Sequence, residues 1–322
     1  MRSANRSRCI AGVPVLLFAA VLSVQTLQAQ SVSTPQNSRT AACDKLQTRK
    51  QRRFPKPSGA DAAFLNINNV EFGISNFGNI AYDPDTGGYQ GLYYPAGQRA
   101  LSVIYTGGLW LVGDVNGEIR SASCQYSTEY QPGMILPGGV ADDPADEKYR
   151  VFTFDANNPP TAEAIAQGCP SELMGDQMLY CVYNDLGSHE YLNDTDPLGV
   201  EVQQTVWGYE SLGPLYNVAF CRFRIINKGG NDINDAYLAM FYDFDIGDSN
   251  DDAGGSDEVR GLVYSYNGDG YDENYGIRVP AIASDFFQGP IVDAPEETAV
   301  LNDGTVLAGK KILQQTAAFH FV

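Results

Sequence analysis

The hydrophobic and polar positions from Asp61 onward repeat mostly with a period of two residues. Residues 200–207 alternate in this way. Residues 216–226 do so again, with Arg222 and Arg224 on the face opposite the apolar side chains. Alternation is the pattern of a β-strand that buries one face and leaves the other polar. We therefore expect both segments to be strands of a sheet with one buried face.

Short strands separated by glycine-rich turns are expected in the preceding part of the chain. Residues 100–105, 109–112 and 118–124 have the apolar, β-branched and aromatic composition of strands. The turns between them are predicted at Gly107-Gly108 and at residues 114–117, which end in Asn-Gly.

Residues 236–246 form the next expected strand, whereas helical periodicity is confined to residues 161–167. Many short strands with turn signals between them are typical of an all-β fold, here an antiparallel β-sandwich or a pair of stacked sheets with long acidic loops. No linker or internal repeat interrupts residues 61–322, so we expect one β-sandwich-like domain there. Residues 317–322 read as a strand without a stop signal, which fits either a truncated longer polypeptide or a domain that ends on a strand.

The N-terminus has the features of an export signal. A basic start is followed by an apolar stretch from Ile10 to Val24 and by a cleavage-like Leu27-Gln-Ala29. We assign residues 1–29 to a signal peptide and expect no membrane span after its cleavage, because no other stretch is apolar enough. Residues 30–60 contain seven basic residues and one acidic residue, which predicts a disordered basic linker.

The overall charge excludes one class of partner. Acidic residues outnumber basic ones by 39 to 21, which gives a net charge of −18. Because much of the basic charge lies in the N-terminal 60 residues, the predicted domain is more acidic still. Nucleic acid binding requires a positive surface, so we expect no nucleic acid partner.

The densest chemical signal is the acidic segment 243–258, in which seven residues are Asp or Glu and three are glycines. These carboxylates repel one another at neutral pH unless a cation lies among them. Oxygen ligands at alternate positions of a flexible loop suit Ca²⁺, which takes roughly six to eight oxygens. A solvated acidic hairpin tip is the alternative. The expected calcium ligands are Asp243, Asp245, Asp248, Asn250, Asp252 and Asp257.

A second acidic patch follows at residues 267–273, where Asn-Gly and Asp-Gly occur close together. Both dipeptides are common in hairpin turns. We expect a turn here, and a second cation site is the alternative.

The cysteines suggest one disulfide in an exported protein. Five of the six cysteines lie after the signal, and Cys169 and Cys181 are the closest pair in sequence, so we expect them to be bonded. Cys221 falls on the apolar face of its predicted strand and is expected to be a buried thiol. The chain has no C-x-x-C spacing, so zinc and iron–sulfur sites are not expected.

The chain has no convincing catalytic constellation. Residues 247–250 (Gly-Asp-Ser-Asn) are superficially similar to the nucleophile block of GDSL-type esterases. Neither His189 nor His320 has the acidic residue three positions upstream that this family pairs with its base. His189 is expected to be a polar loop residue. Schemes built on a carboxylate pair stay open, and Trp110 and Trp207 are either core residues or a sugar-binding platform.

Five strings of residues resemble a known group of proteins. They are Asn69-Val-Glu-Phe-Gly-Ile-Ser-Asn76-Phe-Gly-Asn79, Gly107-Gly-Leu-Trp110-Leu-Val-Gly113-Asp-Val-Asn116-Gly117, Pro197-Leu-Gly-Val-Glu201-Val-Gln-Gln-Thr, Ile225-Ile-Asn-Lys-Gly229 and Tyr242-Asp-Phe-Asp-Ile-Gly-Asp248. The resemblance is to large uncharacterised secreted proteins that are typically cargo of the type IX secretion system and carry a C-terminal sorting domain. It covers roughly residues 65–275 and implies a β-rich body with a cell-surface or extracellular destination. This chain departs from the pattern because no sorting domain precedes Val322.

These features favour a secreted or cell-surface β-sandwich protein with a structural calcium site and a non-enzymatic role as an adhesive or matrix component. Extracellular polysaccharide and other surface proteins are the expected partners. The alternative is a carbohydrate-binding module, or a glycoside hydrolase that uses a carboxylate pair. A groove lined by exposed Trp110 or Trp207 would favour this alternative.

Overall fold

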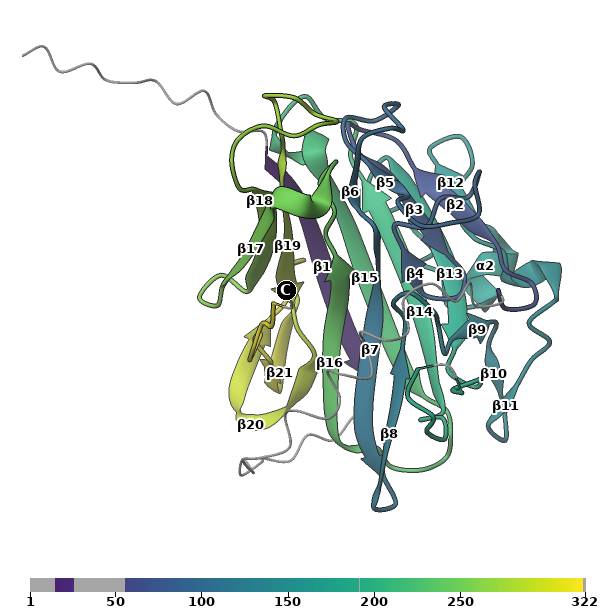
Figure 1. The fold of residues 1–322 in the computed structure, drawn as a ribbon. Coiled ribbons are helices and arrows are strands. Elements are labelled where there is room, and N and C mark those ends of the chain that lie inside the picture. Colours follow the sequence, from purple (N-terminus) through teal and green to yellow (C-terminus); the bar gives the residue numbers. More distant parts are fainter. Residues whose placement is uncertain (1–14, 26–55, 191, 321–322) are drawn as a thin grey trace, which may run out of the picture.

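Two large β-sheets packed face to face form the body of the protein (Figure 1). The computed structural model describes residues 15–25, 56–190 and 192–320, with the backbone alone described for residues 15–25. Within these ranges there is one short α-helix, and no helix is long and apolar enough to cross a membrane. The expected all-β fold of stacked sheets is confirmed.

The first sheet has nine strands. In spatial order they are β12 (Phe152–Asp155), β13 (Gln177–Asn184), β14 (Val200–Gly208), β15 (Val218–Asn227), β1 (Val15–Gln25), β19 (Ala281–Gln288), β18 (Leu262–Asn267) and β17 (Asp252–Asp257), with β9 (Gln131–Pro132) paired to β13.

The second sheet has eight strands. In spatial order they are β16 (Asn234–Asp243), β7 (Thr106–Val115), β4 (Asn79–Ile80), β3 (Glu71–Ser75), β5 (Leu92–Tyr93) and β6 (Ser102–Ile104), with β2 (Ala62–Leu65) paired to β3 and β8 (Glu118–Ser123) paired to β7.

Smaller elements surround the two sheets. They are the strand pairs β10 (Ile135–Leu136) with β11 (Val140–Ala141) and β20 (Ile291–Val300) with β21 (Val306–Ile312), the helix α2 (Ala162–Ala166), and the 3₁₀ turns η1 (Glu147–Tyr149), η2 (Pro214–Asn217) and η3 (Ser249–Asp251). The α-helix lies within the segment predicted to be helical.

The strands predicted from alternation at residues 200–207 and 216–226 are confirmed as β14 and β15. The turn predicted at residues 114–117 also exists, because Asn116 and Gly117 both have positive φ and connect β7 to β8. The turn predicted at Gly107-Gly108 is wrong, since both glycines lie inside β7. A Cβ on Gly108 would lie 2.6 Å from the Cys124 Cβ, so this glycine allows close packing and does not reverse the chain.

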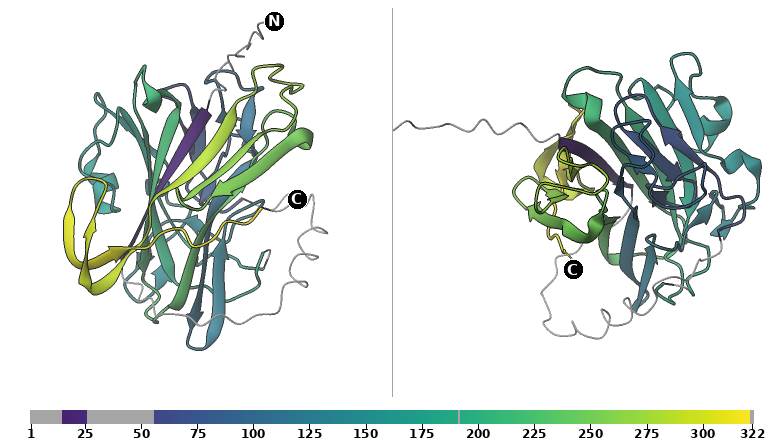
Figure 2. Two further views of the ribbon diagram at one scale, coloured as in Figure 1. Left: turned by 90° about the vertical axis from the view of Figure 1, so that its left-hand side faces the viewer. Right: turned by 45° about the horizontal axis from the view of Figure 1, so that its top comes forward.

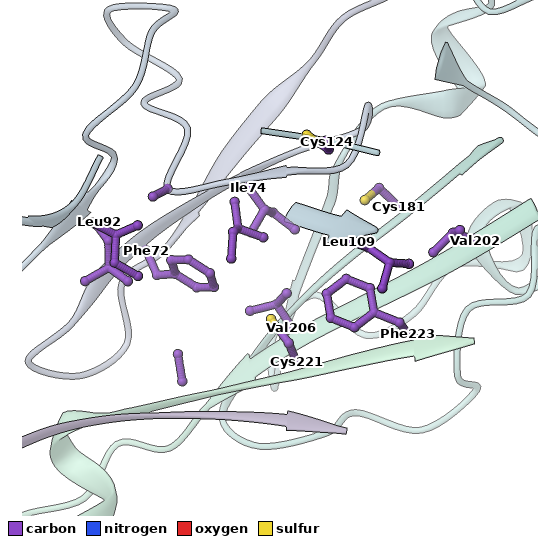
Figure 3. Packing of buried hydrophobic residues seen from close by; sticks show 14 of the residues in the cluster. Phe72, Ile74, Leu92, Leu109, Cys124, Cys181, Val202, Val206, Cys221 and Phe223 are labelled. Atoms are coloured by element: carbon purple, nitrogen blue, oxygen red, sulfur yellow. The ribbon is translucent and has the colours of Figure 1, made fainter. Parts of the chain in front are cut away.

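The core lies between the two sheets (Figure 3). Phe223 of β15 and Leu109 of β7 are both fully buried in it. A second apolar cluster covers the outer face of the first sheet, where Trp207 and Phe152 pack with α2. The first sheet is therefore covered on both faces over β12–β15.

The predicted disulfide between Cys169 and Cys181 is wrong. Both residues are free thiols, as are Cys124 and Cys221. Cys181 lies in the core between the sheets, whereas Cys169 lies in the cluster on the outer face, so the first sheet separates them. Burial raises the pKa of Cys169 to about 12, and Cys221 is the buried core thiol that its strand pattern predicted. Cys43, the remaining cysteine after the predicted signal peptide, lies outside the described residues.

β1 lies between β15 and β19, as the left view of Figure 2 shows, and it runs parallel to both. All other strand pairs in the two large sheets are antiparallel. β1 thus joins the β12–β15 half of the first sheet to the β17–β19 half. The predicted signal peptide includes this strand, and its other residues, 1–14 and 26–29, lie outside the described residues.

Most of the predicted basic linker, residues 30–55, also lies outside the described residues. Its last five residues contact the domain. The Lys56 ammonium lies 5.1 Å from the centre of the Tyr82 ring, and Asn76 Nδ2 donates to the Gly59 carbonyl at 3.0 Å. The ordered body therefore includes residues 56–60 as well as the predicted domain.

Candidate functional site

The acidic segment begins where β16 leaves the second sheet. The strand ends at Asp243, whose carbonyl accepts a hydrogen bond from the Tyr105 N–H at 2.8 Å. Ile246 then enters the core, where its side chain is fully buried, and the Gly247 N–H donates to the Ser102 carbonyl at 3.0 Å. These contacts hold the start of the segment against β6 and β7.

Asp272, from the second acidic patch, meets this segment. Its Oδ2 accepts from the Asp248 N–H at 2.7 Å, and its Oδ1 accepts from the N–H groups of Asn274 and Tyr275. Gly247 has a φ of 65°, and a Cβ there would lie 2.3 Å from Asp272 Oδ1. Only glycine combines this left-handed backbone with so close an approach.

The hairpin of β17 and β18 brings the two acidic patches together, because Asp252 pairs with Asn267. Asn267 Nδ2 donates to Asp251 Oδ2 at 2.6 Å. The Gly270 N–H donates to Asn267 Oδ1, so the predicted turn is also present. We call the aspartates that meet here the acidic corner: Asp243, Asp245, Asp248, Asp251, Asp252 and Asp272.

Two carboxyl groups of the acidic corner have pKa values well above the usual range for aspartate. Burial, together with the charges of Asp243 and Asp252, raises the pKa of Asp245 to about 7. Burial also raises the pKa of Asp252 to about 6, an effect opposed by the hydrogen bond from the Ile246 N–H and increased by neighbouring aspartates. Burial and the mutual repulsion of neighbouring carboxylates account for both shifts.

Two oxygens in the acidic corner lack hydrogen-bond donors although they are buried. They are Asp251 Oδ1 and Asp252 Oδ1. A buried carboxylate oxygen without a donor is costly, and a cation removes that cost. Among the described residues, however, no three His, Cys, Asp or Glu side chains are arranged to hold a metal ion as they stand. The donor set fits Ca²⁺ chemically, and binding requires side-chain rotations in the loop.

The structure does not bring all the predicted ligands together. Asp257 lies at the far end of β17 from Asp252 and forms an ion pair with Arg260, which lowers its pKa. Asn250 is exposed, and its side chain donates to Asp248 Oδ1 at 2.6 Å. Sequence reasoning did not place Asp251 and Asp272 among the ligands. The β17–β18 hairpin was the signal that could have found Asp272.

An aromatic row runs beside the acidic corner on the second sheet. It consists of Tyr89, Tyr105, Tyr126, Phe241 and Trp110, with successive ring centres 5.1 to 6.3 Å apart. Trp110 and Phe241 are stacked with an interplanar angle of 4°. The hydroxyl of Tyr126 donates to Asp243 Oδ2 at 2.9 Å, which links the row to the acidic corner.

A polar cavity of about 330 Å³ lies at the Tyr89 end of the aromatic row. Its wall includes Tyr93, Arg99 and Asn274, together with Gly247 of the acidic segment. The Tyr93 hydroxyl donates to Asp83 Oδ2 at 2.6 Å, and the Arg99 guanidinium pairs with Glu71 at 2.6 Å. The cavity thus offers aromatic, cationic, amide and carboxylate groups together.

A second polar cluster surrounds His189, which lies in a loop as expected and whose side chain is buried. Its Nε2 lies 2.7 Å from the Asp185 carbonyl, and its Nδ1 lies 3.9 Å from Glu129 Oε2. The Asp185 carboxylate accepts from the N–H groups of residues 198–200, and burial raises its pKa to about 6. Glu129 accepts from Ser123 and from residue 193. The two carboxylates accept hydrogen bonds from these loop residues and thereby hold the loops in place.

Trp207, the other predicted platform residue, is buried in the outer cluster and stacked on Phe220. It is therefore a packing residue. No family model, curated protein or solved structure matches this chain. The resemblance to type IX cargo proteins accordingly stays a prediction.

Proposed function

We propose that this chain is a secreted or cell-surface β-sandwich protein whose acidic corner binds a structural Ca²⁺ ion, and that it serves a non-enzymatic role as an adhesive or matrix component. The export-like N-terminus and the resemblance to type IX cargo support the location. The satisfied buried carboxylates near His189 support the non-enzymatic role.

One observation carries the calcium proposal. Asp251 Oδ1 and Asp252 Oδ1 are buried without donors, beside an Asp245 carboxyl whose pKa is raised to about 7. Ca²⁺ would neutralise this repulsion and supply the missing partner for both oxygens. An ion at this position would also tie the end of β16 to the β17–β18 hairpin, that is, one sheet to the other.

Calorimetric titration of metal-free protein with CaCl₂ tests the proposal. Wild type should bind one Ca²⁺ ion, and Asp252→Asn should weaken binding at least about tenfold, because it removes a charged ligand. Asp257→Asn is the matched control, since Asp257 is paired with Arg260 outside the acidic corner. An absence of binding heat, or an equal loss in both variants, would contradict a site at this corner.

A carbohydrate-binding role is the second candidate, and the polar cavity with the adjoining aromatic row favours it. Aromatic faces stack on pyranose rings, and the carboxylate, amide and guanidinium groups of the cavity can bind sugar hydroxyls. The row includes partly exposed Trp110, and Tyr126 is 43% exposed.

Affinity electrophoresis in soluble polysaccharides tests this candidate. Tyr126→Ala should abolish retardation by a polysaccharide that slows wild type. Tyr237→Ala is the control, because Tyr237 is also on the second sheet and 59% exposed but is not part of the row. The carbohydrate-binding role would be contradicted if no polysaccharide in a broad panel retarded wild type, or if Tyr126→Ala and Tyr237→Ala were retarded equally.

A further inference from the structure

The space that β1 occupies has the width of one strand. Because β1 pairs with both β15 and β19, these two strands are separated by two strand spacings, roughly 10 Å. They cannot hydrogen-bond to each other across that distance. Their outer edges are paired already, β15 with β14 and β19 with β18. We call the space between β15 and β19 the strand slot.

The strand slot has a long row of backbone partners on each side. β1 pairs with Val218–Ile226 over nine residues and with β19 between Ala281 and Gln288. A chain lacking β1 would leave these N–H and C=O groups unpaired inside a sheet, next to the core. Such an unpaired edge is unstable and readily accepts another strand.

The two faces of the strand slot differ in chemistry. The inward positions lie beside Ala219, Cys221, Phe223 and Ile225 of β15, all of them buried in the core. The outward positions lie beside Arg222 and Arg224 on β15 and beside Asp285 on β19. Arginines therefore flank two successive outward positions of the occupant.

We propose that the strand slot of the exported protein accepts a strand from a partner polypeptide, which runs parallel to β15 in the place of β1. This inference rests on the proposed export, because removal of residues 1–29 takes β1 away. The partner strand pairs over about nine residues, carries apolar side chains at its inward positions and acidic ones opposite Arg222 and Arg224. Backbone pairing gives the affinity, and the alternating side chains give the specificity.

Analysis of the N-terminus of the protein recovered from the culture medium tests the strand-slot proposal separately from the export proposal. Mass spectrometry should show that residues 15–25 are gone. Presence of the protein in the medium tests export by itself. An exported protein that retains residues 15–25 would overturn the strand-slot proposal and leave the export proposal standing.

The probe for the strand slot is a synthetic peptide with the sequence of residues 15–25 and solubilising lysines beyond both ends. It should bind the exported protein and slow amide exchange in β15 and β19 at least about a hundredfold. The control peptide carries Ala20→Pro and Leu22→Pro, which remove N–H donors from the ladder, and should have no effect.

Charge on the probe tests the predicted partner chemistry. Positions 21 and 23 pair with Arg222 and Arg224, so a peptide with Val21→Glu and Ser23→Glu should bind at least about fivefold more tightly than one with Lys at both positions. Equal affinities would overturn the acidic character of the partner. If the amides of β15 were fully protected from exchange without added peptide, the proposal of an open strand slot would be overturned. If such a protein were also dimeric, the occupant of the strand slot would be a second copy of the chain.

Discussion

The metal-free protein should lose stability as the pH rises through the range in which Asp245 ionises. Its folded-state pKa is about 7, above the ordinary value of about 4 for an unfolded aspartate. The folded state therefore holds the proton more tightly than the unfolded state. The resulting stabilisation is fully present below about pH 4 and is lost by about pH 7.

The size of this effect follows from the pKa difference. A shift of about three units corresponds to about 4 kcal/mol at about 1.4 kcal/mol per unit. Asp245 is only partly buried, so solvent screening reduces the expected value to about 2 kcal/mol. Asp245→Asn keeps the size of the side chain and removes its charge. The variant should thus be about 2 kcal/mol more stable than wild type at pH 8 in EDTA, with little difference at pH 4.

Urea unfolding at pH 4, 6 and 8, in EDTA and in CaCl₂, measures this prediction. The difference between wild type and Asp245→Asn isolates one carboxyl group from the many others in this acidic chain. Calcium at a hundredfold excess over its dissociation constant should stabilise wild type by about 2.7 kcal/mol at pH 8 and should stabilise the variant less. If the stability of the two proteins in EDTA changed with pH in the same way, the raised pKa of Asp245 would be refuted.

Three further predictions concern the packing around the site and the core. Cys169 and Cys181 should both react with a thiol reagent in denaturant without reductant, because each is a free thiol; a mass showing an intact bond between them would contradict the separation by the sheet. Lys228→Met should lower the free energy of unfolding by about 3 kcal/mol in urea titrations, because it leaves the fully buried Glu201 carboxylate without the cation that lies 2.5 Å away; a change below about 1 kcal/mol would show that the remaining donors suffice. Gly247→Ala should cost at least about 1 kcal/mol in the same assay, since its φ is 65°; unchanged stability would mean that the turn can adopt another backbone conformation.

Local alternation predicted two strands of the first sheet, β14 and β15. The segment that forms β15 has small and apolar residues at every second position, such as Cys221 and Phe223. This alternation predicts a strand that buries one face against the other sheet. Gly107 and Gly108 were misjudged because paired glycines usually mark turns. Gly108 packs against Cys124, and Gly107 packs against Phe241 and Ile80; no local sequence pattern connects these residues to the two glycines.

The acidic corner was predictable only in the part that depends on neighbours in the sequence. Asp243 and Asp245 are close in sequence, so their proximity needed no knowledge of the fold. Asp272 depends on the register of the β17–β18 hairpin, which pairs Asp252 with Asn267. The expected disulfide failed because closeness in sequence does not tell which face of a sheet a side chain occupies.

The most direct test of the calcium site is a crystal structure of the protein grown with CaCl₂, with anomalous scattering used to locate the ion. One calcium peak is expected in the acidic corner, with Asp245, Asp251 and Asp252 oxygens within about 2.3–2.6 Å of it. No peak at this corner, together with ordered Asp251 and Asp252 side chains that keep their present positions, would contradict it.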